Sequence, residues 1–290
     1  MSRDPRADLA GVAVGGDLPV VVVGVVNVSP ESFHPGSVYQ GDEAVVKAAL
    51  GMVEAGAALI DVGARSTAPY LDAAIDEEQE AARLARAIEA LAAKLPVPVS
   101  ADTSRPGPAR AALEAGARVI NDVCTLRDPA LARLVAAHSA SLILMASPAA
   151  SEQGVTRRRP PSPTGTVKRL LADGLRRAHA SGIPPQRIVV DPGVGFFRTG
   201  SVAWPEWDLQ VLRNLAGLRA LGRPIAVGVS RKSFIGAILE RPDPRDRLAG
   251  SLAATAIAVV NHAALIRTHD VGETREAARV AERLRGRGAR

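Results

Sequence analysis

The sequence is poor in cysteine, in aromatic residues and in long apolar runs. Its single cysteine, Cys124, has no partner for an internal disulfide, which excludes a disulfide scaffold and indicates a reducing compartment, the cytoplasm. One cysteine also cannot supply the ligand spacing of a structural zinc site. No apolar run reaches the roughly 18 residues that a membrane span needs, and residues 1–18 are charged and lack the apolar stretch of a signal peptide. We therefore expect neither a membrane protein nor a secreted one.

Aromatic residues make up only 3% of the chain, although basic residues are in excess. Lys and Arg number 36 against 30 Asp and Glu, a net charge of +6. Proteins that bind nucleic acids commonly combine such an excess with aromatic side chains on which bases stack, and no basic segment here alternates with aromatic residues. We therefore predict no nucleic-acid partner, and a small polyanionic substrate explains the same excess.

What the sequence does contain is a repeated unit. A short run rich in β-branched residues is followed by a polar turn and then by a segment with apolar residues three or four apart, which predicts a strand followed by a helix. The runs are almost wholly apolar, as expected of strands covered on both faces. The strands are expected at residues 21–26, 58–62, 97–101, 118–122, 141–145, 187–190, 224–229 and 263–268. The helices are expected at residues 43–55, 77–94, 105–115, 129–139, 166–181, 209–221, 246–261 and 273–284.

Eight strand–helix units in about 250 residues have the number and size of a (β/α)8 barrel, the TIM barrel. Residues 19–290 are expected to form this single domain, and residues 1–18 an N-terminal extension. A chain of this length with 47% hydrophobic residues buries enough surface for one large core. A doubly wound open sheet is the alternative, and the count of eight argues against it.

In a TIM barrel the active site lies at the carboxyl ends of the strands, so polar residues directly after each apolar run are the candidates. Asp102 and Asp191 follow the third and sixth runs, and Asn121 lies at the end of the fourth. Two carboxylates and an amide suit a purine-like or pterin-like heterocycle with several N–H groups. The alternative is that each aspartate caps the following helix, because aspartate is a preferred N-cap residue.

Residues 191–196, Asp-Pro-Gly-Val-Gly-Phe, form a predicted turn after the sixth strand. Gly193 and Gly195 let the backbone approach a ligand closely, and Phe196 suits contact with a flat ring. Lys232 follows the seventh strand, where its ammonium suits a ring carbonyl or a phosphate. The alternative for Lys232 is a solvated surface lysine.

The last strand carries Arg267 and His269, whose side chains are expected on the same face because strand residues alternate with period two. In a closed barrel the eighth strand neighbours the first, which brings Asn27 close to them. These residues predict an anion site, and this fold commonly binds phosphate near its late strands. His269 is not expected to bind a metal, because no second His or Cys lies at ligand spacing.

The candidate residues stand within seven short blocks. The blocks are Gly-Val-Val-Asn-Val-Ser-Pro-Glu-Ser-Phe at 24–33, Asp-Val-Gly at 61–63 with Ser66 and Thr67, Asp-Thr at 102–103, Asn-Asp-Val at 121–123, Asp-Pro-Gly-Val-Gly-Phe at 191–196, Ser-Arg-Lys-Ser-Phe-Ile-Gly at 230–236 and Arg-Thr-His-Asp at 267–270. In order and over nearly the whole chain they resemble the dihydropteroate synthase family. The resemblance implies a TIM-barrel transferase of folate biosynthesis, which joins 6-hydroxymethyl-7,8-dihydropterin pyrophosphate to p-aminobenzoate and releases pyrophosphate.

The resemblance also implies a role for each candidate residue. The groups that hold the pterin ring and assist the reaction are Asp102, Asp191 and Lys232, with Asn121. The walls of that pocket are Met145 and Phe196. The residues that receive the pyrophosphate are Asn27, Arg267 and His269, with Mg²⁺ bound at Asn27, and those that border the arylamine are Phe33, Thr67, Pro69 and Ser233. Family members are commonly homodimers, so we expect a homodimer.

The sequence departs from the family pattern after the second strand. Where the family reads Gly-Gly-Glu-Ser-Thr-Arg-Pro-Gly, this chain has Arg65, Ala68 and Tyr70 at the third, sixth and eighth positions. Because this loop borders the arylamine in the family, the departures alter the half of the site that binds the second substrate. The pterin half retains its residues.

Three hypotheses follow. The first is a synthase that uses p-aminobenzoate. The second is a related enzyme for a larger amine, such as the ribofuranosylaminobenzene phosphate of methanopterin-type cofactors, for which Arg65 adds positive charge and Ala68 makes room. The third is a catalytically silent paralogue that binds pterin only. A corrinoid-linked methyltransferase with a pterin-binding barrel is more distant, and the residues of the pyrophosphate site argue against it.

Overall fold

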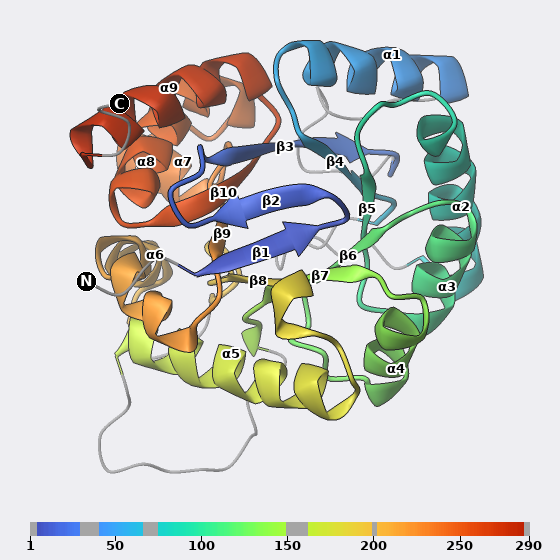
Figure 1. Cartoon of the computed structure of the whole chain (residues 1–290). Helices are drawn as coiled ribbons and strands as arrows, with labels where there is room; N and C mark the ends of the chain where they lie inside the picture. The colour runs from blue at the N-terminus through green and yellow to red at the C-terminus, as the bar shows by residue number, and fades with distance from the viewer. Residues whose placement is uncertain (1–4, 30–40, 66–74, 149–161, 199–201, 287–290) are drawn as a thin grey trace.

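A closed barrel of parallel strands forms the centre of the molecule (Figure 1). The computed structural model describes residues 5–29, 41–65, 75–148, 162–198 and 202–286. In these ranges the eight barrel strands are β3 (Val21–Asn27), β4 (Leu59–Gly63), β5 (Val99–Asp102), β6 (Val119–Asp122), β7 (Ser141–Met145), β8 (Ile188–Asp191), β9 (Ile225–Gly228) and β10 (Ala263–Thr268). The last strand, β10, pairs in parallel with the first, β3, which closes the sheet. The predicted TIM barrel is confirmed, and the open doubly wound sheet is excluded.

Helices cover the outside of the barrel. They are α1 (Asp42–Glu54), α2 (Glu77–Ala92), α3 (Pro106–Glu114), α4 (Pro129–Ala137), α5 (Pro163–Ala180), α6 (Trp204–Arg213), α7 (Ser233–Leu239), α8 (Leu248–Val260) and α9 (Val271–Leu284). Three of them begin at an N-cap residue: the side chains of Asp76, Asp128 and Ser162 accept hydrogen bonds from backbone N–H groups in the first turns of α2, α4 and α5. No helix in the described ranges is long and apolar enough to cross a membrane.

The helices of the structure differ from the prediction in two places. The segment 209–221 is not one helix, because α6 begins earlier and ends at Arg213, and residues Leu215–Leu221 form a 3₁₀ helix. Asn214 separates the two with non-helical backbone angles, and its side chain donates to the carbonyl of Gln210. The other difference is α7, a seven-residue helix that was not predicted because it is too short to show a helical period.

Strand side chains alternate between two apolar layers. In β3, Val22 and Val26 pack in the layer between the sheet and the helices, whereas Val21 and Val23 point to the inside of the barrel. The period-two alternation of a strand therefore gives the barrel an inner core and an outer core. This explains why the strand runs are apolar at nearly every position.

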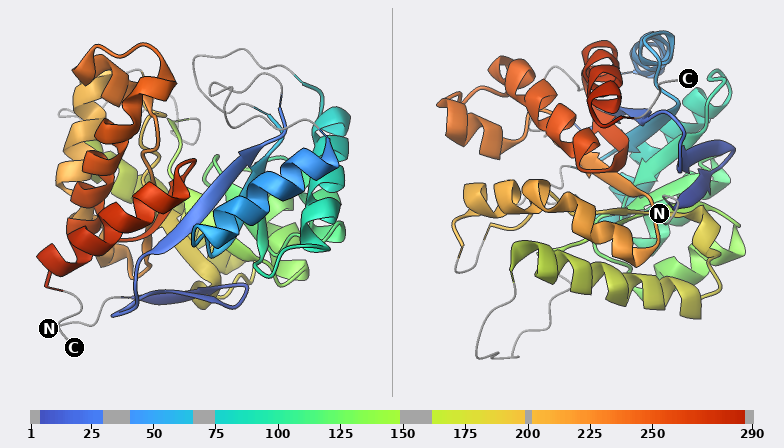
Figure 2. Two further views of the ribbon diagram at one scale, coloured as in Figure 1. Left: turned by 90° about the horizontal axis from the view of Figure 1, so that it is seen from above. Right: turned by 60° about the vertical axis from the view of Figure 1, so that its left-hand side comes forward.

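The described part of the predicted N-terminal extension is a β-hairpin, β1 (Arg6–Leu9) and β2 (Val12–Gly15). The hairpin lies across the amino-terminal end of the barrel, and the arrow of β3 points away from it (Figures 1 and 2). Leu9 and Val14 are fully buried in the inner core, and the hydroxyl of Ser141 on β7 donates to the carbonyl of Asp8 at 3.1 Å. The hairpin thus covers the end of the barrel opposite to the candidate residues.

We expect Leu9→Ala to lower the free energy of unfolding by about 2–5 kcal/mol, because it opens a cavity in the inner core. Denaturant unfolding followed by circular dichroism measures the change. Arg6→Ala, on the exposed side of the same strand, is the control and should change stability by less than about 0.5 kcal/mol. Equal effects of the two substitutions would show that the hairpin does not belong to the core.

Candidate active site

The predicted site residues meet at the carboxyl end of the barrel. Asn27, Asp102 and Asp191 are the last residues of β3, β5 and β8. Neighbouring strands hold Asp102 beside Asn121 and Asp191 beside Met145 in register. Because parallel strands end on the same side, these side chains come together although they are distant in sequence.

The centre of the site is an arginine held between two carboxylates. The Nη2 atom of Arg267 donates to Oδ2 of Asp61 and, at 3.0 Å, to Oδ2 of Asp102. The amide of Asn121 donates to the same Asp61 oxygen at 3.0 Å. Asp61 lies within β4 and is fully buried. Asp61 was not among the predicted site residues, although a carboxylate inside an otherwise apolar strand is a signal of a functional or paired acid.

Three acceptor oxygens in this centre have no hydrogen-bond partner among the described residues. They are Oδ1 of Asp61, Oδ1 of Asp102 and Oδ1 of Asn121, and each atom is buried. Buried acceptors are normally satisfied, so a group of them on neighbouring strands suggests a ligand that supplies N–H donors. A flat heterocycle with amino and ring N–H groups has this pattern.

Burial shifts the ionisation of the charged groups. It raises the pKa of Asp102 to about 7, against the opposing charge of Arg267, and it also raises the pKa of Asp191. Burial lowers the pKa of Lys232 to about 8, assisted by Arg267 and opposed by Asp191. Near neutral pH the site therefore contains one acid, Asp102, and one base, Lys232, that are close to the middle of their titrations, which is typical of active sites.

The turn after β8 has the predicted close-packed form. One oxygen of Asp191 accepts the backbone N–H of Gly193 at 2.8 Å. Gly193 has a φ of 71°, and a β-carbon there would lie 2.2 Å from the carbonyl oxygen of Ala146, so only glycine fits. Asp191 thus holds its own turn, whereas Asp102 bonds to Arg267, and the N-cap position of α3 is Arg105. The capping alternative does not describe either aspartate.

Lys232 is not a solvated lysine, because it packs against this turn. Its Nζ lies 4.5 Å from the centre of the Phe196 ring. A β-carbon at Gly195 would come within 3.1 Å of its Cδ, which shows how closely the side chain follows the backbone. A β-carbon at Gly193 would lie 3.5 Å from Cγ of Met145. The structure therefore brings the two predicted pocket walls, Met145 and Phe196, to the turn that carries Asp191.

The predicted anion-binding residues take two places. Arg267 lies between the carboxylates, whereas Nδ1 of His269 is 3.0 Å from the hydroxyl oxygen of Ser230. Asn27 is close to the carboxylates, since a β-carbon at Gly63 would lie 3.3 Å from its Oδ1 and 3.9 Å from Cβ of Asp102. His269 therefore lies on the side of the site next to β9, and Asn27 lies on the side next to β4.

The part of the site expected to border the arylamine is only partly described. Phe33, Thr67 and Pro69 lie outside the described residues, as do Ala68 and Tyr70 of the atypical loop. Ser233 is the first residue of α7, and its hydroxyl accepts a hydrogen bond from Nη2 of Arg198. The guanidinium of Arg198 also lies 4.0 Å from the Trp204 ring centre.

Arg65, which replaces the family's glutamate, belongs to a buried ionic cluster around Glu80 of α2. The Glu80 carboxylate is 3.4 Å from Nε of Arg65, accepts Nη1 of Arg105 at 3.0 Å and accepts the hydroxyl of Thr103 at 2.5 Å. Glu80 is only 1% exposed. The same Arg105 nitrogen donates to the carbonyl of Ile75 at 3.0 Å. Through Glu80 and Arg105 the cluster therefore connects Arg65 and Ile75 with Thr103, the residue that follows Asp102.

We expect Glu80→Gln to destabilise the protein by about 2–4 kcal/mol, because two half-buried arginines lose the buried carboxylate that neutralises them. Urea unfolding at neutral pH measures the loss. The matched control is Glu78→Gln on the same helix, which is exposed and should be nearly neutral. A Glu80 variant as stable as this control would contradict the structural role of the cluster.

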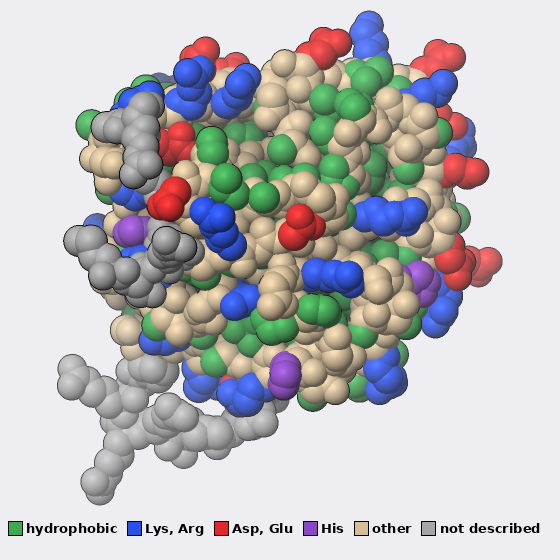
Figure 3. Space-filling model, viewed as in Figure 1, with side chains coloured by type: hydrophobic (Ala, Val, Ile, Leu, Met, Phe, Trp, Pro, Cys, Tyr) green, Lys and Arg blue, Asp and Glu red, His purple; other side chains and the backbone are tan. Residues whose placement is uncertain are grey.

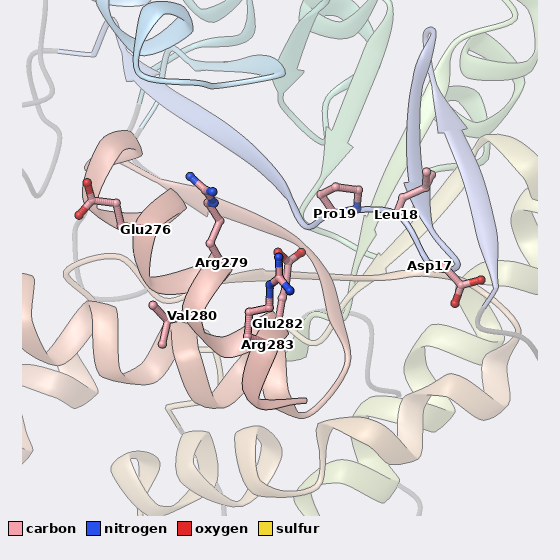
Figure 4. A pocket seen from close by; sticks show the side chains of 8 residues that line it. All are labelled: Asp17, Leu18, Pro19, Glu276, Arg279, Val280, Glu282 and Arg283. Carbon is pink, nitrogen blue, oxygen red and sulfur yellow. The ribbon is translucent and has the colours of Figure 1, made fainter. Parts of the chain in front are cut away.

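Another hollow lies at the opposite end of the barrel, between α9 and the segment that joins the hairpin to β3 (Figure 4). Its charged lining alternates in sign, with Glu276 and Glu282 next to Arg279 and Arg283. Glu282 accepts the backbone N–H of Val20 at 2.5 Å, which is a structural role. On the surface shown in Figure 3, acidic and basic side chains are likewise interspersed. This end of a TIM barrel commonly serves stability, and we assign no ligand to it.

Fold and site together define a class: a TIM-barrel protein whose strand ends carry buried acceptor oxygens suited to a flat heterocycle rich in N–H groups, beside basic residues suited to an anion. Residues 23–269 match the family described as pterin binding enzyme. A dihydropteroate synthase of Synechocystis sp. is 34% identical over 264 residues, which are 91% of this chain and 89% of that protein.

Solved structures agree with this class. The dihydropteroate synthase of Xanthomonas albilineans with 4-aminobenzoic acid superposes with a TM-score of 0.84 at 36% identity, covering 97% of this chain and 98% of that one. The same enzyme in complex with 7,8-dihydropteroate gives 0.81 at 35% identity, with the same coverage. The chain therefore belongs to the dihydropteroate synthase family of pterin-binding transferases.

Proposed function

We propose that this protein transfers the pterinylmethyl group of 6-hydroxymethyl-7,8-dihydropterin pyrophosphate to p-aminobenzoate or a related arylamine, with release of pyrophosphate. The observation that carries the proposal is the set of buried acceptors without partners on Asp61, Asp102 and Asn121, next to the cations of Arg267 and Lys232. A pterin offers N–H donors to the acceptors and a carbonyl to a cation. The Xanthomonas relative has been solved with an arylamine and with the product, 7,8-dihydropteroate.

The site suits this chemistry electrostatically. The bond between the exocyclic carbon and the diphosphate oxygen breaks, and its electron pair leaves with the diphosphate. The resulting cation is delocalised into the pterin ring, so buried carboxylates facing the ring stabilise the transition state more than the ground state. The arylamine nitrogen then forms the new bond to carbon and loses a proton. The reaction requires no covalent bond to the protein.

Mg²⁺ is part of the proposal, with Asn27 as its protein ligand. In the described residues no group of three or more His, Cys, Asp or Glu side chains could hold a metal by itself. Magnesium is commonly bound by one or two protein oxygens and by substrate phosphates, so a single amide oxygen fits. The Oδ1 atom of Asn27 lies next to Gly63, where a β-carbon would come within 3.3 Å of it. When bound there, Mg²⁺ would neutralise charge on the leaving diphosphate.

The identity of the amine separates the three hypotheses. The contact of Arg65 with Glu80 weakens one reason for a phosphorylated amine, because that guanidinium already has a buried counter-charge. The test supplies purified protein with the pterin pyrophosphate, Mg²⁺ and one amine at a time, and measures pyrophosphate release. Release with p-aminobenzoate supports the synthase, and release only with ribofuranosylaminobenzene phosphate supports the second enzyme. Pterin binding without release supports the silent paralogue.

A homodimer through α8 and α9 is also part of the proposal. Ile257 on α8 is 51% exposed, and Val280 and Leu284 on α9 are 62% and 76% exposed. Large exposed apolar side chains on adjacent helices favour an interface with a second copy. Sedimentation analysis tests this, since Ile257→Glu should convert a dimer to a monomer. A wild-type protein that sediments as a monomer contradicts the proposal.

The cytoplasm is the compartment that we propose. Cys124 is half-buried, and burial raises the pKa of its thiol, so it is a poor nucleophile and a poor site for oxidation. The partners in the proposed reaction are small molecules.

A further inference from the structure

The reaction proposed above makes no use of Asp208, a buried acid of α6 behind the Asp191 turn. Asp208 is 1% exposed, and its Oδ1 accepts the backbone N–H of Gly195 at 2.9 Å. Its Oδ2 is buried and has no hydrogen-bond partner among the described residues. A buried carboxylate with one unsatisfied oxygen is costly, so its retention calls for a specific explanation.

Gly195 connects Asp208 with Lys232. The glycine has a φ of 87°, and the Lys232 side chain passes so close that a β-carbon there would meet its Cδ at 3.1 Å and its Nζ at 3.6 Å. The Gly195 carbonyl also accepts Nε of Arg198 at 3.2 Å, so both polar groups of this residue are held. The position of the backbone against which Lys232 lies thus depends on Asp208.

The charge of Asp208 also acts on Lys232. The ionisable groups facing Lys232 are Asp102 of β5, Asp191 of β8, Asp208 of α6 and the cation Arg267 of β10. Burial and Arg267 lower the pKa of Lys232, whereas the three acids raise it. Asp102 and Asp191 face the place proposed for the pterin, but Asp208 lies behind the turn, where a ligand does not compete for it.

We propose that Asp208 is a positioning residue for the pterin half of the site: its carboxylate fixes the turn on which Lys232 lies and supplies the negative charge that favours the cationic form of Lys232. This inference rests on the proposed function, in which Lys232 binds the pterin as a cation. Asp208 itself does not touch the substrate.

Two substitutions separate the hydrogen bond from the charge. Asp208→Asn retains an oxygen that accepts the Gly195 N–H and removes the charge, whereas Asp208→Ala removes both. Calorimetric binding of pteroate from pH 6 to 9 is the measurement, and the titration of pteroate itself is common to all the proteins compared. An opposite charge close to a buried group changes its pKa by about one or more, so for Asp208→Asn we expect the alkaline loss of affinity to begin about one pH unit lower. That corresponds to nearly unchanged affinity at pH 6.5 and a roughly eightfold loss at pH 8.5.

The sign follows from Lys232, because affinity that depends on its protonated form is lost as the pH rises through its pKa, and removing Asp208 lowers that pKa. Asp208→Ala should weaken binding at every pH. Asp128→Asn is the control, because it removes one exposed acid and keeps an N-cap side chain for α4. An unshifted pH profile of Asp208→Asn would overturn the inference. Failure of the wild type to bind pteroate would instead refute the proposed function.

Discussion

Lys232→Ala is expected to weaken pteroate binding by about 10- to 100-fold, because hydrogen bonds to charged groups contribute about 1.5–3 kcal/mol. The side chain is half-buried and packs against Gly195 and Phe196, and its charge faces Asp102 and Asp191. Asp191→Asn should have a similar effect, because it removes a carboxylate that faces Lys232 in the same site. Isothermal calorimetry with pteroate near pH 7 measures both, and pyrophosphate release should fall with the affinity.

The control for this pair is Lys47→Ala on the exposed face of α1, which removes the same kind of charge far from the strand ends. Circular dichroism shows whether each variant is folded. If Lys232→Ala and Asp191→Asn both bind pteroate with wild-type affinity, the pocket is assigned to the wrong residues. A loss in one variant alone would mean that only that residue contacts the pterin.

Arg267→Met is expected to destabilise the protein by about 3–5 kcal/mol at pH 8, because it removes the guanidinium that hydrogen bonds to the carboxylates of both Asp61 and Asp102. The loss should be smaller at pH 5.5. Asp102 has a folded-state pKa of about 7, raised above its ordinary value by burial, so its protonated form stabilises the fold at low pH and this contribution is lost as the pH rises through 7. Without Arg267 that pKa rises further, and the difference from the wild type widens with pH.

Urea unfolding of the wild type and of Arg267→Met at both pH values measures this difference. Adding Asp61→Asn to the Arg267→Met variant should recover part of the stability, since one of the two uncompensated charges is then removed. The same loss at pH 5.5 and pH 8, with no recovery in the double variant, would show that Arg267 acts through packing and not through its charge. Turnover should be lost in either case.

The relation between sequence and fold is direct where the interactions are local. The apolar runs predict all eight barrel strands to within two residues, because a strand covered on both faces needs apolar residues on both. The turn at residues 191–196 can also be predicted from the sequence, because Gly193 has a positive φ and lies so close to the carbonyl oxygen of Ala146 that only glycine fits. The short helix α7 escaped prediction because seven residues do not establish a period, and the 3₁₀ segment after α6 was predicted as part of one longer helix.

The sequence by itself therefore determined the order of strands and helices and placed Asp102, Asn121 and Asp191 at strand ends, because these follow from periodicity and local turn chemistry. Only the tertiary structure decided which charged side chains form ion pairs and hydrogen bonds with one another. Arg267 hydrogen bonds to Asp61 and Asp102, which are 206 and 165 positions away in the chain. Glu80 forms ion pairs with Arg65 and Arg105. The tertiary structure also brings Asp208 to the backbone of Gly195, against which Lys232 packs. The closure of the barrel creates these pairs, and no local pattern in the sequence specifies where a closed sheet brings two distant side chains together.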